Sequence, residues 1–118
     1  MADLIDIAAV DDLETGHPKL VTVGDAPVCV VRLADGTIHA VHDMCTHAEE
    51  SLSEGWVEGE RIECPRHGAF FSLIDGAPTT PPATLPVPVF RVEVRDGRVL
   101  VDPEPDRPHP LLDDDQTD

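Results

Sequence analysis

Short apolar segments separated by Asp-Gly pairs are the feature that most constrains how this chain folds. The pairs stand at positions 35–36, 75–76 and 96–97 of the 118-residue sequence. Asp-Gly favours tight hairpin turns, because a type I′ turn needs positive φ angles at its central residues. Few of the segments between the turns have a helical period. We therefore expect an all-β, antiparallel domain with strands over residues 19–23, 27–33, 37–41, 56–57, 61–63, 69–73, 89–95 and 98–101, and one helical turn at 8–13.

The charge balance limits the kinds of partner. Acidic side chains outnumber basic ones by 24 to 8, which gives a formal net charge of −16. A hydrophobic content of 41% still allows a core to form, and the length fits one small domain. Nucleic acids and anionic membrane surfaces have the same sign of charge as the chain, so we expect neither as a partner. A basic protein surface fits better.

The cysteine count and the N-terminal segment indicate a cytoplasmic protein. Residues 1–10 contain no basic region, and Asp3 and Asp6 interrupt any apolar run, so we expect neither a signal peptide nor a membrane anchor. No stretch of 18 apolar residues occurs that could span a bilayer. The chain has three cysteines. An odd number does not fit a disulfide framework, and a reducing compartment is the better interpretation.

Two segments differ in composition from the strands. Residues 78–89 contain five prolines, cannot pair as a central strand and are expected to cross the surface in an extended form. From Asp102 onward the chain has four prolines, seven acidic residues and one arginine. This composition predicts a disordered acidic tail over residues 102–118, following a folded domain at 1–101.

Two Cys/His pairs form the candidate metal site. Cys45 and His47 form a C-x-H pair, Cys64 and His67 form a C-x-x-H pair, and sixteen residues separate the pairs. Each pair follows a predicted strand, so two hairpin loops could hold one metal centre, each with a thiolate and an imidazole. Two cysteines and two histidines suit zinc or a Rieske [2Fe–2S] cluster. A common zinc finger pairs like residues in each arm. The mixed arms found here favour a cluster in which one iron binds both cysteines and the other iron binds both histidines.

The residues around these pairs resemble a known family. The segments C-T-H-A-E-E-S-L-S-E-G and E-C-P-R-H-G-A-F-F are similar to those of the small Rieske ferredoxins of bacterial ring-hydroxylating dioxygenases, and the resemblance covers about residues 30–101. It implies a Rieske fold, with an antiparallel β-sandwich or barrel base and a small two-loop cluster-binding subdomain at about 44–73. It also implies that the proline-rich segment is a third loop that shields the cluster. One [2Fe–2S] cluster would be bound by the four residues of the pairs, Cys45, His47, Cys64 and His67.

The resemblance implies a function in electron transfer. Single electrons would pass from an NAD(P)H-dependent flavoprotein ferredoxin reductase to the terminal oxygenase of an aromatic-ring dioxygenase system. We expect no enzyme activity, because nothing after Val101 could supply the mononuclear iron site of an oxygenase and no Gly-rich dinucleotide motif occurs. The alternatives are a Rieske-type small subunit of an assimilatory NAD(P)H nitrite reductase and a zinc-stabilised interaction module. The sequence does not name the aromatic substrate.

Four positions beside the predicted ligands indicate a low reduction potential. Two neutral imidazoles in place of two thiolates raise the potential of Rieske centres into a range of about −150 to +300 mV. Respiratory Rieske proteins add a disulfide, a serine and a tyrosine, with the patterns C-T-H-x-x-C and C-x-C-H-G-S-x-Y. The corresponding residues here are Glu50, Arg66, Ala69 and Phe71, and the chain has no tyrosine. Hydrogen bonds to sulfur stabilise the reduced cluster, so we expect the low end of the range. Glu50 and Arg66 are hypothesised to form an ion pair between the loops.

Other candidate residues have ordinary interpretations. Cys29 lies in a valine-rich segment and is interpreted as a small buried hydrophobic residue. His42 and His109 have no partner at ligand spacing and are interpreted as solvated or hydrogen-bonded, although His42 is near enough to the first pair to influence it. An acidic rim on the surface is predicted from Glu49, Glu50 and Glu54.

Overall fold

The computed structural model describes residues 3–45, 50–65, 69–79 and 85–109, and these residues form an antiparallel all-β fold. This confirms the predicted fold class. Along the chain the elements are β1 (Ile5–Ala9), η1 (Val10–Asp12), β2 (Lys19–Val23), β3 (Ala26–Arg32), β4 (Ile38–His42), η2 (Leu52–Glu54), β5 (Trp56–Glu58), β6 (Arg61–Glu63), β7 (Phe70–Ser72), β8 (Val89–Phe90), β9 (Val92–Arg95) and β10 (Arg98–Val101). The two η elements are single 3₁₀ turns, and the described residues contain no helix long and apolar enough to cross a membrane.

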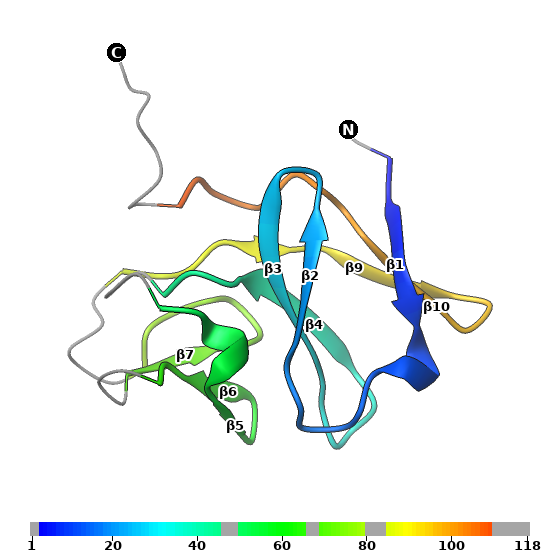
Figure 1. The fold of residues 1–118 in the computed structure, drawn as a ribbon. Coiled ribbons are helices and arrows are strands. Elements are labelled where there is room, and N and C mark those ends of the chain that lie inside the picture. Colours follow the sequence, from blue (N-terminus) through cyan, green and yellow to red (C-terminus); the bar gives the residue numbers. More distant parts are fainter. Residues whose placement is uncertain (1–2, 46–49, 66–68, 80–84, 110–118) are drawn as a thin grey trace, which may run out of the picture.

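The strands form three sheets. Their strand orders are β1-β10-β9, β2-β3-β4-β8 and β5-β6-β7. In Figure 1 the β2-β3-β4 strands lie in the middle of the molecule, with β1, β9 and β10 toward one end and β5, β6 and β7 toward the other. The middle sheet therefore has a neighbouring layer on each face.

The sequence of β3 explains this arrangement. Its residues Val28 and Val30 belong to one buried cluster, and the alternating residues Cys29 and Val31 belong to another. All four side chains are fully buried. Successive side chains of a strand point to opposite faces of its sheet. A continuous apolar run such as that of β3 is thus suited to a strand covered on both sides.

The predicted hairpins at two of the three Asp-Gly pairs are confirmed. Asp96 and Gly97 both have positive φ angles, 50° and 76°, and join β9 to β10. Gly36 has a φ of 90° and lies in the turn from β3 to β4. The third pair differs, because Asp75-Gly76 follows β7 and leads into an irregular segment. There the amide of Val87 donates a hydrogen bond of 2.9 Å to the Gly76 carbonyl.

Three elements differ from the sequence prediction. The expected strand at 89–95 is divided at Arg91, so that β8 joins the middle sheet and β9 joins β10. Part of the expected helical turn at 8–13 is strand β1, and only Val10–Asp12 forms a 3₁₀ turn. β1 pairs with β10 near the other end of the sequence. Arg98 supports this pairing by donating two hydrogen bonds to the Asp6 carboxylate, from Nη2 at 2.9 Å and from Nε at 3.1 Å.

Residues 102–109, here called the C-terminal strap, differ from the disordered tail expected from the sequence. The amide of Asp102 donates to the Arg91 carbonyl, and the amide of Asp106 donates to the Val89 carbonyl, each at 2.9 Å. His109 is 95% buried, with 5% of its surface exposed. The remainder of the predicted tail, residues 110–118, lies outside the described residues.

Replacement of Gly76 by alanine is expected to destabilise the fold by about 3 kcal/mol, from a strained positive φ together with a steric clash. The φ of Gly76 is +77°, and a Cβ atom there would lie 2.1 Å from the Val87 carbonyl oxygen. Gly36→Ala is the control, because its φ is +90° but no atom lies within 4 Å of the added Cβ. It should cost about 1 kcal/mol from the backbone conformation alone. If chemical denaturation shows equal losses of unfolding free energy for Gly76→Ala and Gly36→Ala, the close approach of the Val87 carbonyl to Gly76 does not contribute to stability.

Candidate metal centre

Cys45 and Cys64 lie at matching positions of two loops. Cys45 follows the end of β4, and its amide donates a hydrogen bond of 2.9 Å to the Glu50 carbonyl. Cys64 follows β6, and its amide donates a hydrogen bond of 2.7 Å to the Ala69 carbonyl. Each loop is therefore closed by a backbone hydrogen bond at its cysteine. The two Cys/His pairs predict two loops that each follow a strand, and the cysteines of both pairs lie at such positions.

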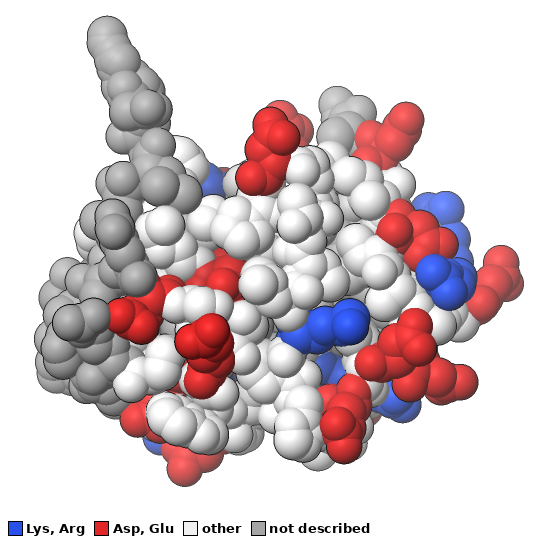
Figure 2. All heavy atoms as spheres, in the orientation of Figure 1, with Lys and Arg blue, Asp and Glu red and all other residues white. Residues whose placement is uncertain are grey.

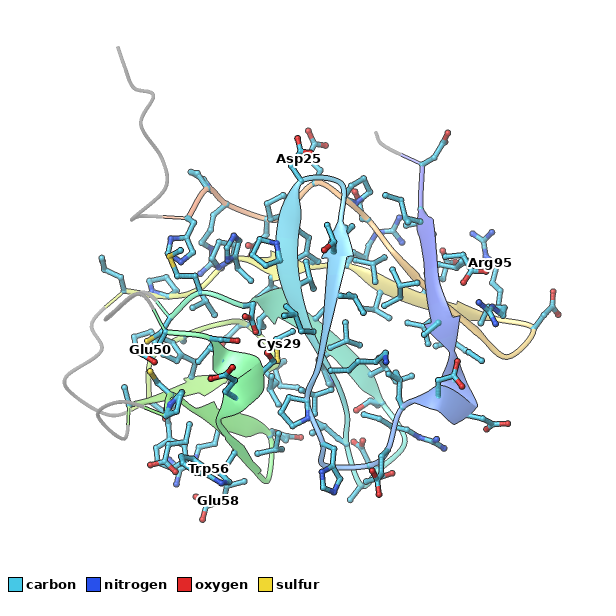
Figure 3. All side chains as sticks on the ribbon, in the orientation of Figure 1. Asp25, Cys29, Glu50, Trp56, Glu58 and Arg95 are labelled. Carbon is cyan, nitrogen blue, oxygen red and sulfur yellow. The ribbon has the colours of Figure 1, made fainter. Side chains whose placement is uncertain are left out.

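Both cysteines are buried in the same apolar cluster. The side chains of Cys45 and Cys64 are fully buried, and they share this cluster with Cys29 of β3. Figure 3 shows Cys29 on the middle sheet, in the interior of the molecule. Burial raises the pKa of the Cys29 thiol, and the charge of Asp43 raises it further. The interpretation of Cys29 as a small buried hydrophobic residue is confirmed.

The histidines of the predicted ligand set lie outside the described residues. His47 and His67 fall in the ranges 46–49 and 66–68, as does Arg66, the proposed partner of Glu50. The structure places the two cysteines of the predicted site in one buried cluster. The histidine half and the ion pair between the loops stay predictions.

Two apolar side chains occupy the positions at which respiratory Rieske proteins have hydroxyl groups. Ala69 and Phe71 are both fully buried, and both belong to the cluster that contains the cysteines. Phe71 pairs with Ile62 across the β6–β7 ladder. Neither a methyl group nor a phenyl ring can donate a hydrogen bond to sulfur. Neither Ala69 nor Phe71 therefore supplies a side-chain hydrogen-bond donor beside the second loop.

Asp43 is a structural residue that the sequence analysis missed. Only 5% of its surface is exposed. Its carboxylate accepts a hydrogen bond of 2.8 Å from the Ser53 amide and another from the Ser51 hydroxyl. The Asp43 amide donates a hydrogen bond of 2.9 Å to the Pro27 carbonyl, and the Asp43 carbonyl accepts one of 2.6 Å from the Leu52 amide. Asp43 thereby connects the start of the first loop to its end. The sequence feature that could have indicated this role is an acidic residue two positions before Cys45, together with serines at 51 and 53.

Two buried histidines lie beside the first loop. The rings of His42 and His109 are tilted by 55° to each other with centroids 4.6 Å apart, and each residue is 5% exposed. Burial, and then the neighbouring His109, lower the pKa of His42 to about 4 against the opposing effect of Asp43. Burial also lowers the pKa of His109. Both rings are therefore neutral near pH 7.

Acidic side chains outnumber basic ones in the region of the two loops, as they do in the whole chain. Residues 44–73 contain six acidic side chains and two basic ones. In Figure 3 Trp56 and Glu58 lie on β5 toward one end, and Arg95 lies at the opposite end. Basic side chains in Figure 2 gather mainly on the side of β1 and β10. Arginines of that end form ion pairs, namely Arg91 with Glu93 and Asp102, Arg95 with Glu93, and Arg98 with Asp6.

The chain is similar to known proteins over most of its length. The family profile of the Rieske [2Fe-2S] domain matches residues 3–91. Ferredoxin CarAc of Metapseudomonas resinovorans is 44% identical over 96 residues, which cover 80% of this chain and 89% of that protein. The anthranilate 1,2-dioxygenase ferredoxin subunit of Burkholderia cepacia is 36% identical over 101 residues, covering 86% of this chain and 93% of that protein.

Solved structures show the same fold. A chain in the complex of reduced oxygenase and oxidized ferredoxin of carbazole 1,9a-dioxygenase superimposes with a TM-score of 0.83 at 40% identity, covering 89% of this chain and 97% of that chain. A nitrite reductase small subunit from Mycobacterium tuberculosis gives a TM-score of 0.79 at 28% identity, covering 86% and 95%.

Replacement of Asp43 by alanine is expected to lower the free energy of unfolding by about 3 kcal/mol, because it removes two hydrogen bonds to a carboxylate and leaves the half-buried Ser53 amide without its acceptor. Asp43→Asn retains an acceptor and should lose less than half as much. Asp35→Ala is a surface control, because Asp35 bonds the amide and hydroxyl of Thr37 at an exposed turn. Chemical denaturation of the three variants measures the difference. Equal losses for Asp43→Ala and Asp35→Ala would contradict the assigned role.

Proposed function

Because the chain belongs to the Rieske [2Fe-2S] domain family, we propose that it is a low-potential Rieske ferredoxin of an aromatic-ring dioxygenase system. It carries single electrons from an NAD(P)H-dependent flavoprotein reductase to a terminal oxygenase. The observation that carries this proposal is the pair of buried cysteines on two matching loops. It is supported by relatives of 44% and 36% identity that are named as ferredoxins, one of them a dioxygenase subunit.

The proposed ligands of one [2Fe–2S] cluster are Cys45, His47, Cys64 and His67. The donor chemistry fits the cluster, because thiolate sulfur and imidazole nitrogen are the ligands of a Rieske centre. Once bound, the cluster takes up and releases one electron. Cys45 and Cys64 would supply the sulfur ligands from the apolar cluster in which both are fully buried.

The surrounding residues exclude water from the two sulfur ligands. Leu52, Ile62, Phe71 and Val87 are fully buried in the cluster of residues that contains both cysteines. An apolar shell controls solvent access to a metal centre and therefore its potential. In this proposal, residues 1–101 form the Rieske domain and about 44–73 form its cluster-binding lobe.

The charge distribution supports a basic partner surface. The proposed lobe has six acidic and two basic side chains, and a surface of one sign accelerates the encounter with a partner of the other sign. We therefore propose basic protein surfaces as partners. We also propose that the chain is an electron carrier of the cytoplasm and not an enzyme. The nitrite reductase small subunit is the second candidate, and the lower identity of 28% makes it the weaker one.

Alanine replacement should separate the proposed cysteine ligands from the third cysteine. We expect Cys45→Ala and Cys64→Ala to abolish the visible absorption of the purified protein and the Rieske electron paramagnetic resonance signal of its reduced form. Cys29→Ala should retain both, because Cys29 is assigned a packing role only. Metal analysis completes the test, with two irons per chain expected for the wild-type protein from the composition of the cluster. A colourless wild-type protein that contains stoichiometric zinc would refute the proposed function.

The reduction potential tests the interpretation of Ala69 and Phe71. We expect the wild-type potential to lie toward the lower limit of the Rieske range, at about −150 mV. Ala69→Ser should raise it, because a serine hydroxyl can donate a hydrogen bond to sulfur. Ala69→Gly is the control without a hydroxyl and should change the potential less. Voltammetry gives both values. A wild-type potential in the upper half of the range would contradict the low-potential assignment.

A purified flavoprotein reductase of a related dioxygenase system tests the direction of electron flow. With NADH present, it should bleach the ferredoxin at a rate that falls with increasing salt, because the attraction between an acidic and a basic surface is screened. Adding the matching oxygenase under air should restore the oxidised spectrum. The second candidate would be favoured if no such reductase reduced this protein but the large subunit of a nitrite reductase reduced it rapidly.

A further inference from the structure

The C-terminal strap connects three parts of the domain. Besides its bonds to β8, the strap reaches the segment after β7, where Nη2 of Arg107 donates a hydrogen bond of 3.4 Å to the Asp75 carbonyl. It then reaches Met44, whose carbonyl accepts a hydrogen bond of 2.9 Å from Nε2 of His109. Figure 1 shows the strap returning over the molecule toward the side of β5, β6 and β7. The family profile ends at residue 91, and the strap lies after it.

The pairing of Met44 with Ser51 explains why the strap can bind there. The two residues face each other in an isolated antiparallel bridge. The hydrogen bonds of the bridge lie on either side of this pair, where the Leu52 amide donates to the Asp43 carbonyl and the Cys45 amide donates to the Glu50 carbonyl. In such a non-hydrogen-bonded pair the amide and carbonyl of each residue point away from the partner strand. The main-chain groups of Met44 are therefore available to other acceptors and donors.

Two imidazoles take up both of these main-chain groups. The Met44 amide donates to Nδ1 of His42 at 3.1 Å, and the Met44 carbonyl accepts from Nε2 of His109 at 2.9 Å. An amide can only donate and a carbonyl can only accept, so Nδ1 of His42 is unprotonated and Nε2 of His109 is protonated. The two rings contact each other and hold the residue that precedes Cys45 from two sides.

The peptide group between Met44 and Cys45 is consequently fixed at both ends. Its oxygen accepts from His109, and its nitrogen, the Cys45 amide, donates to the Glu50 carbonyl at 2.9 Å. A peptide group is planar. Bonds to its oxygen and its nitrogen together set the orientation of the plane, so that only rotation about the N–Cα bond of Cys45 then determines the direction in which its side chain leaves the backbone.

We propose that His109 is a positioning residue for the first cluster loop, acting from the C-terminal strap through the Met44 carbonyl on the orientation of Cys45. This inference rests on the proposed function, because it takes Cys45 as a cluster ligand. It assigns a role to a segment that lies after the Rieske profile. The strap retains the cluster and keeps water from the base of the loop by closing over His42.

The test compares three variants of the cluster-containing protein. His109→Phe retains a buried ring beside His42 but has no donor for the Met44 carbonyl. We expect it to lose its cluster to a chelator about fivefold faster than the wild-type protein, the factor that corresponds to one neutral hydrogen bond. Its reduction potential and the g-values of its reduced form should also shift. His109→Gln carries an amide N–H near the position of Nε2 and should restore all three properties toward the wild-type values.

Two truncated chains provide a control for the strap itself. A chain that ends at Leu112 retains His109 and loses only the last six residues, and it should behave as the wild-type protein does. A chain that ends at Pro108 lacks the histidine and should match His109→Phe in cluster loss and in its spectrum. Should this chain fail to fold, the comparison of His109→Phe with His109→Gln still decides the question.

Failure of this inference can be distinguished from failure of the proposed function. A wild-type protein without a Rieske signal would refute the proposed function. A wild-type protein with that signal, together with unchanged cluster loss, potential and g-values in His109→Phe, would overturn the role of His109 alone. The role of His109 would also be overturned if His109→Phe lowered the free energy of unfolding but left the reduction potential and the g-values unchanged. That result would indicate that His109 contributes to packing only.

Discussion

The burial of β3 on both of its faces is the constraint on which the rest of the molecule depends. A strand covered on one face only could leave its opposite face polar, but the run of apolar residues from Val28 to Val31 needs a layer on each side. One layer is the sheet of β1, β10 and β9. The other contains β5, β6 and β7 together with the two cysteine loops. Cys45 and Cys64 are thereby packed in the same buried cluster as Cys29 and Val31 of β3. Ligands that must keep their geometry in two oxidation states need such support.

Sequence signals of short range predicted much of this structure. The Asp-Gly turns at 35–36 and 96–97, and the hairpin of β5 and β6, follow from local backbone preferences. The closure of both loops at Cys45 and Cys64 agrees with the spacing of the Cys/His pairs. Strand β1 was missed, because it depends on a pairing with β10 that is far away in the sequence and leaves no local pattern.

Composition was a poor guide to the C-terminal strap. Prolines and acidic residues indicated disorder from Asp102 onward, whereas residues 102–109 are held by hydrogen bonds to backbone groups that the sequence does not identify. Asp43 was overlooked for a related reason. A single acidic residue looks like part of a solvated surface until the fold shows that it is buried and that Ser51 and Ser53 face it.

In the part of the chain that the structure describes, hydrogen bonds join the strap to main-chain atoms of the domain at Met44, Asp75, Val89 and Arg91. The seat of the strap is thus defined largely by the course of the backbone, and its side-chain interactions include the ion pair of Asp102 with Arg91 and the contact of His109 with His42. Other domains with the same backbone course could accept such an extension without having been selected for it. An appended segment of this kind could therefore arise, be exchanged or be grafted as a unit, which would let a loop around a redox centre be adjusted without altering the loop itself.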